Sequence, residues 1–122
     1  RSTLFPYTTL FRSTNRLTLL RDPSCTAVFS ANDEMAVGLM RAAAELGRRV
    51  PQDLSIVGVD DIPLVSFLPV PLTTVRQDFA EMGRVAVERL MRIISTGKPD
   101  PGAHLVEVRL VERASTAPPR GR

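Results

Sequence analysis

The sequence predicts an α/β domain in which a parallel sheet is flanked by helices. Two patterns support this fold class. Short apolar runs of strand length alternate with amphipathic segments of helical period along the 122-residue chain. The run over residues 54–59 is almost continuously apolar, which is typical of a strand buried on both faces of a parallel sheet. The length allows a single core, and the 43% hydrophobic content is that of an ordinary globular domain.

The first strand and helix are expected within residues 26–46. Residues 26–30 are a compact apolar run, and Asn32 then opens an amphipathic helix over 33–46. Asn is a favoured N-cap, and the acids at positions 33 and 34 suit the positive end of the helix dipole. Gly47 supplies the left-handed residue that often ends a helix, and Pro51 prevents its continuation.

The second half of the chain repeats the pattern. The strand over 54–59 ends at Asp60 and Asp61, and a proline-punctuated loop leads to a short extended piece over 73–75. An amphipathic helix is predicted over 78–94, with an apolar stripe that includes Met82, Ala86 and Leu90. The alternation over 106–111 indicates a half-exposed edge strand.

The first thirteen residues, RSTLFPYTTLFRS, resemble residue for residue one reading frame of a short-read sequencing adapter. We therefore expect 1–13 to be a non-native scar, 14–116 to be a partial domain whose native N-terminus is missing, and 117–122 to be a disordered tail. Without Arg1 and Arg12, the number of basic side chains falls from 16 to 14 against 13 acidic ones. The pI near 10 then no longer argues for nucleic-acid binding by this segment.

Polar residues follow two of the predicted strands. Asn32 and Asp33 come after the first strand, and Asp60 and Asp61 come after the second. Ligands of open α/β sheets bind beyond the carboxyl ends of the strands. An amide beside a carboxylate suits a hydroxyl-rich small molecule. The alternatives are that Asn32 is only a helix cap and that the two aspartates only begin a turn.

The sequence gives little sign of disulfide, metal or catalytic chemistry. A single cysteine, Cys25, cannot form an internal disulfide, and His104 has no neighbouring metal ligand in the sequence. We find no nucleophile motif, phosphate-binding loop or metal-binding motif, so the sequence predicts no enzyme, no cofactor and no metal. No apolar run approaches the roughly 20 residues of a membrane span, so no membrane association is expected.

Four blocks stand out: TAVFSANDEMAVGLMRAAAELGRRVPQDLSIVGVDD at 26–61, a spacer that contains Ile62, Pro63 and Leu64, PLTTVRQDFAEMGRVAVERLM at 71–91, and VERAST at 111–116. Together they resemble the C-terminal part of the LacI/GalR family of bacterial transcription regulators. The resemblance implies the C-terminal subdomain of a type I periplasmic-binding-protein-like fold. The PLTTVRQ block favours regulators over the family's periplasmic sugar-binding relatives.

The resemblance also implies roles for three residues. Asn32 and Asp60 would hydrogen-bond a small effector, often a sugar or nucleoside, and Phe79 would line the effector cleft. The alternative for Phe79 is a core residue that opens the second helix. The family's helix-turn-helix headpiece, hinge and most of the N-terminal subdomain are expected outside this chain. Contact with operator DNA would therefore belong to the parent protein only.

The parent is thus expected to be a cytoplasmic, homodimeric regulator of repressor type whose two lobes close on a sugar-like effector. The helix over 33–46 and the loop over 62–70 are candidates for the dimer contact, unless their apolar faces simply cover the sheet. The alternative function is a periplasmic sugar-binding protein of a transport system. A DNA-binding headpiece before Thr14 would indicate the regulator, and a signal peptide would indicate transport.

Overall fold

A computed structural model describes residues 19–118 of the chain, and it confirms the predicted α/β class. The sheet has four strands in the spatial order β1-β2-β3-β4. The first three strands are parallel, whereas β4 runs antiparallel to β3, so the sheet is mixed rather than wholly parallel. The predicted scar at 1–13 lies outside the described residues.

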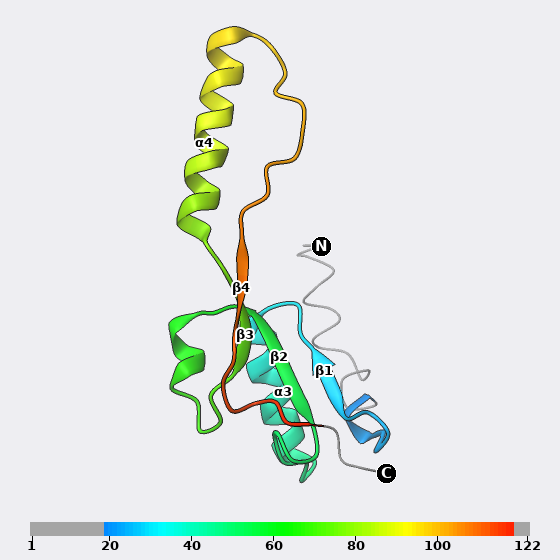
Figure 1. The fold of residues 1–122 in the computed structure, drawn as a ribbon. Helices are drawn as coiled ribbons and strands as arrows, with labels where there is room; N and C mark the ends of the chain where they lie inside the picture. Colours follow the sequence, from blue (N-terminus) through cyan, green and yellow to red (C-terminus); the bar gives the residue numbers. More distant parts are fainter. Residues whose placement is uncertain (1–18, 119–122) are drawn as a thin grey trace, which may run out of the picture.

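The first strand, β1, spans Ala27–Phe29, and the helix α3 spans Asp33–Glu45. Helix α3 begins as predicted, because the side chain of Asn32 accepts a hydrogen bond from the backbone N–H of Met35 at 2.8 Å. Gly47 follows with φ of +71°, the left-handed conformation expected at the helix end. The helix lies against one face of the sheet (Figure 1). It buries Ala36, Leu39, Ala42 and Ala43 there.

Strand β2 spans Ser55–Asp60, and the short 3-10 helix η1 spans Pro63–Ser66. Burial alternates along β2: Ile56 is fully buried in the core, whereas Val57 and Val59 are only half-buried. The expectation that this strand is buried on both faces is therefore wrong. Its continuous apolar run covers the core on one side and leaves a partly open apolar face on the other.

Strand β3 spans Thr73–Gln77, helix α4 spans Phe79–Thr96, and β4 spans Val108–Val111. Figure 1 shows α4 and the segment after it extending beyond the end of the sheet. The predicted apolar stripe of α4 exists, but only Val85 of this helix is buried. Leu90, for example, is 56% exposed. Strand β4 is the half-exposed edge strand that the alternation predicted, since it lies at one side of the sheet and Val108 and Leu110 are 54% and 55% exposed.

After β4 the chain returns to the sheet, where hydrogen bonds from residues 115–117 hold it. Ser115 is buried, and its hydroxyl accepts from the backbone N–H of Thr73 at 2.8 Å and donates to the carbonyl of Ile56 at 2.6 Å. The backbone N–H of Ala117, the first residue of the expected tail, donates to the Ser55 hydroxyl at 3.1 Å. Residues 119–122 of that tail lie outside the described residues.

The core lies between α3, η1 and the sheet. Its largest fully buried apolar side chains are those of Leu20, Leu54, Ile56, Val65 and Leu72. At one edge, the guanidinium of Arg48 donates to the carbonyl oxygens of Leu20 and Asp53, each at 2.9 Å. No helix in the described part of the chain combines the length and apolar content that a membrane span requires.

Candidate functional site

The parallel strands β1 and β2 bring Asn32 and Asp60 to the same edge of the sheet. In the register, Phe29 at the end of β1 lies opposite Val57. The backbone N–H of Ser30 extends the pairing by donating to the carbonyl of Val57 at 2.8 Å. Asn32 follows β1 by a few residues, and Asp60 is the last residue of β2. This is the carboxyl-end edge at which ligands of open α/β sheets bind.

The oxygen and the nitrogen of the Asn32 side-chain amide can play different roles. Its oxygen Oδ1 accepts from the N–H of Met35, which caps α3. Its amide nitrogen Nδ2 takes no part in that cap and offers two hydrogen-bond donors. The structural interpretation of Asn32 is therefore correct, and it remains compatible with a ligand contact at the same residue.

Asp60 is joined by a residue that the sequence analysis did not single out. Oδ1 of Asp60 accepts a hydrogen bond from Nε2 of Gln77 at 2.7 Å. Gln77 is the last residue of β3, which runs parallel to β2. The rule that located Asn32 and Asp60, namely polar residues at the carboxyl ends of parallel strands, would also have located Gln77 had it been applied to the third strand.

Phe79 lies near this edge but apart from the other two predicted residues. It begins α4 and is 56% exposed, so the alternative that it is a core residue is wrong. It lines an open, mainly polar cavity of about 520 Å³ between the start of α4 and β4. Neither Asn32 nor Asp60 lines that cavity, which is formed by Arg76, Gln77, Asp78, Phe79, Glu107, Val108 and Arg109.

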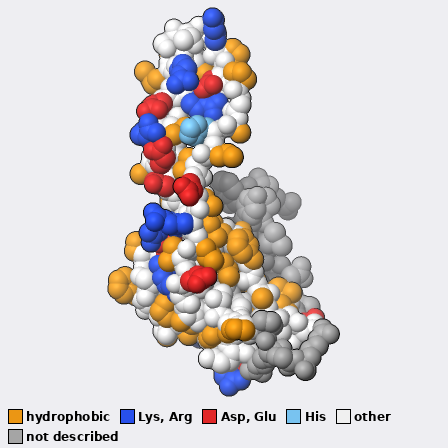
Figure 2. Space-filling model, viewed as in Figure 1, with side chains coloured by type: hydrophobic (Ala, Val, Ile, Leu, Met, Phe, Trp, Pro, Cys, Tyr) orange, Lys and Arg blue, Asp and Glu red, His pale blue; other side chains and the backbone are white. Residues whose placement is uncertain are grey.

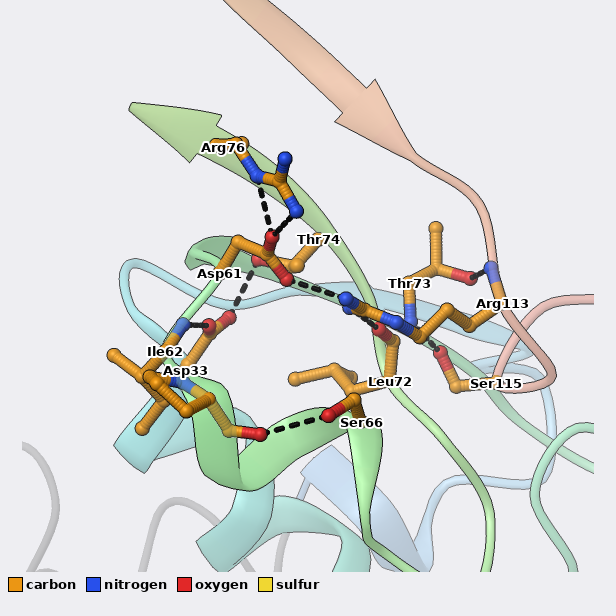
Figure 3. A network of polar contacts seen from close by, with 11 residues as sticks. Asp33, Asp61, Ile62, Ser66, Leu72, Thr73, Thr74, Arg76, Arg113 and Ser115 are labelled. Atoms are coloured by element: carbon orange, nitrogen blue, oxygen red, sulfur yellow. Dashed lines mark hydrogen bonds and ion pairs between the residues drawn. The ribbon is translucent and has the colours of Figure 1, made fainter. Parts of the chain in front are cut away.

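Asp33 lies just behind this edge and is more than a partner for the helix dipole. It is fully buried, with Oδ1 accepting from the hydroxyl of Thr74 at 2.6 Å and Oδ2 accepting from the backbone N–H of Ile62 at 2.9 Å (Figure 3). A Cβ atom at Gly58 would collide with the Asp33 carboxylate. The carboxylate thus joins α3, β3 and the loop after β2, and only glycine fits at position 58 on the intervening strand.

Asp61 points away from Asp33 and forms a second polar centre. Its carboxylate accepts from Nε of Arg76 and from Nη2 of Arg113, both at 2.6 Å (Figure 3). Burial acts to raise the pKa of Asp61, but the hydrogen bonds from Arg113 and Arg76 outweigh it and hold the pKa below its ordinary value. Asp61 is therefore an ionised, doubly paired carboxylate and not merely the first residue of a turn.

Metal-ligating side chains are not grouped in this region. Within residues 19–118, no set of three His, Cys, Asp or Glu side chains lies close enough together to hold a metal ion. His104 is exposed, and Cys25 is half-buried beside β1. What the edge of the sheet offers is a set of hydrogen-bonding groups from Asn32, Asp60 and Gln77.

Comparison with known proteins identifies the family. Residues 6–116 match the family described as periplasmic binding protein-like domain. The HTH-type transcriptional regulator MalR of Streptomyces coelicolor is 50% identical over 94 residues, and the lactose operon repressor of Escherichia coli is 46% identical over 94 residues. These matches cover 76% and 77% of this chain. The chain spans only 27% and 26% of the two relatives, about a quarter of their length.

Solved structures agree with these relatives. A dimeric Lac repressor is similar with a TM-score of 0.74 and 42% identity, over 86% of this chain and 39% of that one. A LacI-family regulator from Enterococcus faecium with bound ribose has a TM-score of 0.74 and 34% identity, over 87% of this chain and 39% of that one. The chain therefore belongs to the periplasmic binding protein-like domain family and corresponds to part of the effector-binding region of LacI-family transcriptional regulators.

Proposed function

We propose that this chain is part of the sensor domain of a transcriptional repressor and that it contributes one wall of a cleft for a sugar or nucleoside effector. The observation that carries the proposal is the placement of Asn32, Asp60 and Gln77 at the carboxyl ends of three adjacent strands, with Gln77 hydrogen-bonded to Asp60. Amide donors beside a carboxylate acceptor match the alternating donors and acceptors of sugar hydroxyls. Similar structures with bound ribose and with lactose support this ligand class.

The second wall of the cleft would come from another lobe of the parent protein. The exposed apolar face of α4 supports this arrangement, since an unpartnered apolar stripe is a usual contact surface. Figure 2 shows hydrophobic side chains at the surface of the α4 extension as well as over the sheet. Effector binding would shift the equilibrium between open and closed lobes by its different affinity for the two states. The closure would change how a DNA-binding headpiece elsewhere in the parent binds the operator. The parent would act in the cytoplasm.

A titration with sugars tests the ligand assignment. Ribose and lactose are added separately to the isotopically labelled 122-residue chain while amide signals are followed by NMR. We expect one of them to shift the signals of Asn32, Asp60 and Gln77, and Asp60→Asn to weaken that response at least tenfold. The matched control is Asp22→Asn, because Asp22 lies in the turn before β1, away from the carboxyl ends. Shifts scattered over the surface, or equal effects of both variants, would count against the site.

A separate experiment tests the regulatory role. In the full-length regulator, Asp60→Ala should weaken the response to effector far more than it weakens operator binding in the absence of effector. The reason is that Asp60 belongs to the effector wall, whereas the operator is contacted by the headpiece. Equal loss of both activities would identify Asp60 as a structural residue only.

We further propose that the parent is a homodimer and that α3 contributes to its interface. The outer side of α3 and the loop after η1 border an open groove of about 740 Å³. Its apolar lining includes Val37, Met40, Ala44, Val50, Leu68 and Val70. A second copy of the chain is the occupant that a two-fold interface would supply, because such an interface places the same patch on both subunits. The similarity to a dimeric Lac repressor supports this occupant.

Sedimentation of the chain tests this interface. Met40→Glu places a charge in the groove, so it should shift the chain from dimer towards monomer. Met91→Glu is the matched control, since Met91 is an exposed residue of α4 that does not line the groove. If Met40→Glu still forms dimers, or if only Met91→Glu abolishes them, the dimer interface lies on another surface of the chain.

A further inference from the structure

We propose that Asp61 is a positioning residue for effector binding, because its ion pairs with Arg76 and Arg113 hold the corner that presents Asp60. This inference rests on the proposed function, since it concerns how the Asp60 carboxylate is held for an effector. It adds a role for Asp61, a residue that does not itself belong to the proposed ligand contacts.

The corner at the end of β2 has a strained backbone. Asp60 has φ of +110° and Asp61 has φ of +55°, so two consecutive non-glycine residues lie at positive φ. Aspartate tolerates the left-handed region better than most residues, yet such conformations persist only where neighbouring contacts enforce them. The corner therefore needs contacts that hold it, and the side chain of Asp61 supplies two of them.

The carboxylate of Asp61 lies in a fork between two arginines. Nη2 of Arg113 donates to Oδ1 at 2.6 Å, and Nε of Arg76 donates to Oδ2 at 2.6 Å. The side chain of Asp61 is only 4% exposed and that of Arg113 is 18% exposed, so solvent screens this pair weakly. Charge-assisted hydrogen bonds of this kind are the stronger ones in proteins. We call this arrangement the Asp61 fork.

Each arginine of the fork is itself fixed to the sheet. Arg76 belongs to β3, next to Gln77, which donates to Asp60. Arg113 follows β4, and its Nη1 donates to the carbonyl of Leu72 at 2.8 Å while its backbone N–H donates to the hydroxyl of Thr73 at 3.0 Å. The fork thus connects the corner to the strand that leads into α4 and to the segment that returns from it.

The next residue of the corner has an anchor of its own, which depends on the corner keeping its shape. The backbone N–H of Ile62 donates to the buried carboxylate of Asp33. Figure 3 shows the Asp61 fork and this Asp33 contact on opposite sides of the same turn. With Asp61 paired and Ile62 bonded, the backbone of Asp60 has little freedom, and its carboxylate stays in reach of Gln77 at the edge of the sheet.

Hydrogen exchange and NMR on the ligand-free chain provide the first test. Asp61→Asn keeps the size of the side chain and its tolerance of positive φ but removes the charge. We expect the amide of Ile62 to exchange at least tenfold faster in this variant and the Asp60–Gln77 side-chain contact to be lost, while amides inside α3 keep their protection. Arg113→Gln should produce the same local changes, and it replaces Asp61→Asn if that variant does not fold.

Arg109→Gln is the matched control. Arg109 lies on β4 opposite Arg76, but it contributes nothing to the fork. We expect wild-type exchange at Ile62 in this variant. The positioning role would be overturned if the Ile62 amide exchanged at the wild-type rate in both Asp61→Asn and Arg113→Gln. It would also be overturned if amide exchange became uniformly faster throughout the chain in both variants.

A ribose titration of the same variants separates positioning from a purely structural role. We expect the affinity of folded protein for ribose to fall about tenfold in Asp61→Asn and in Arg113→Gln, the scale of one lost charge-assisted hydrogen bond. The double variant should bind ribose no more weakly than the weaker single variant, because both substitutions remove the ion pair between Asp61 and Arg113. Unchanged affinity, or additive losses, would overturn the inference. If wild type binds neither ribose nor lactose, the effector assignment fails, and the exchange experiment alone decides the role of Asp61.

Discussion

The side-chain oxygen of Asn32 accepts a hydrogen bond from the backbone N–H of Met35 at 2.8 Å, so the proposed ligand residue is also the N-cap of α3. This relationship places the amide nitrogen of Asn32 at the beginning of the helix, where the helix dipole favours acceptor and anionic groups. Capping and ligand binding use different atoms of one side chain, and substitutions can separate them.

Asn32→Ala should lower the free energy of unfolding by about 1 kcal/mol, because α3 loses its cap. Asn32→Asp should keep the stability near wild type, since aspartate caps equally well, but it should lose the ribose response because the amide donors are gone. Urea unfolding and NMR titration measure the two effects. If Asn32→Asp destabilises the chain as much as Asn32→Ala does, or leaves ribose binding normal, this division of roles is wrong.

Two glycine substitutions should have opposite effects on stability. A methyl group at Gly58 would meet the Asp33 carboxylate and, at 2.9 Å, a methyl carbon of Leu72, so Gly58→Ala should destabilise the chain by about 2 kcal/mol or more. Gly83 lies inside α4 with nothing within 4 Å of an added Cβ. Gly83→Ala should therefore stabilise the chain by roughly 0.5–1 kcal/mol through helix propensity.

Urea unfolding of Gly58→Ala and Gly83→Ala measures the two predicted changes in the free energy of unfolding. Because the two substitutions add the same methyl group, the difference between their effects on the free energy of unfolding reports the space around each position and the backbone preference of strand against helix. A neutral Gly58→Ala would mean that the Asp33 carboxylate moves aside, and the bonds to Thr74 and Ile62 would then be weaker than their distances indicate.

The local features of this fold could be predicted from the sequence. Asn32 and Gly47 mark the ends of α3 because capping depends on residues within one turn of the helix. The carboxyl-end rule likewise located Asn32 and Asp60, since it needs only the order of strands along the chain. The partners of Asp33 and Asp61 could not be predicted in this way. Thr74 lies 41 residues after Asp33, and Arg113 lies 52 residues after Asp61.

The exposure of α4 could not be predicted from the sequence either. Its period-3.6 apolar stripe is the same signal that α3 gives, and amphipathicity shows that a helix has an apolar face without showing what covers it. The alternative that Phe79 is a core residue was wrong for the same reason. The physical difference between the two helices is tertiary: α3 lies on the sheet, whereas α4 extends beyond it (Figure 1).

Stability should depend on the charge of Asp61 in a pH-dependent way. The pKa of Asp61 in the folded chain lies below its ordinary value of 3.8, so the unfolded chain takes up this proton first as the pH falls. The contribution of the carboxylate is therefore present above the ordinary pKa and is lost as the pH falls through the lower, folded pKa. Asp61→Asn should be less stable than wild type by roughly 2 kcal/mol at about pH 6, and the gap should narrow towards about pH 3.

Comparing the stability of wild type with that of Asp61→Asn separates the effect of Asp61 from the effects of the other acidic residues. Hydrogen bonds from Ser24 lower the pKa of Asp22, and a hydrogen bond from Arg84 lowers the pKa of Glu81, but both shifts occur in wild type and variant alike. Urea unfolding at several pH values measures the gap. A gap that stays constant over this acidic range would show that the charge of Asp61 adds nothing to stability.

Polar substitutions on α4 should cost little stability, in contrast to substitutions in the core. Leu90 and Ile94 are 56% and 66% exposed and lie one turn apart, so Leu90→Gln with Ile94→Gln should change the free energy of unfolding by no more than about 0.5 kcal/mol. Leu72→Ala, at a fully buried position just before β3, should cost about 3 kcal/mol. Urea unfolding measures both effects, and light scattering of the double glutamine variant should fall because the exposed apolar stripe is smaller. A large loss of stability in that variant, together with a wild-type stability that rises with protein concentration, would mean that another copy of the chain covers α4 in solution.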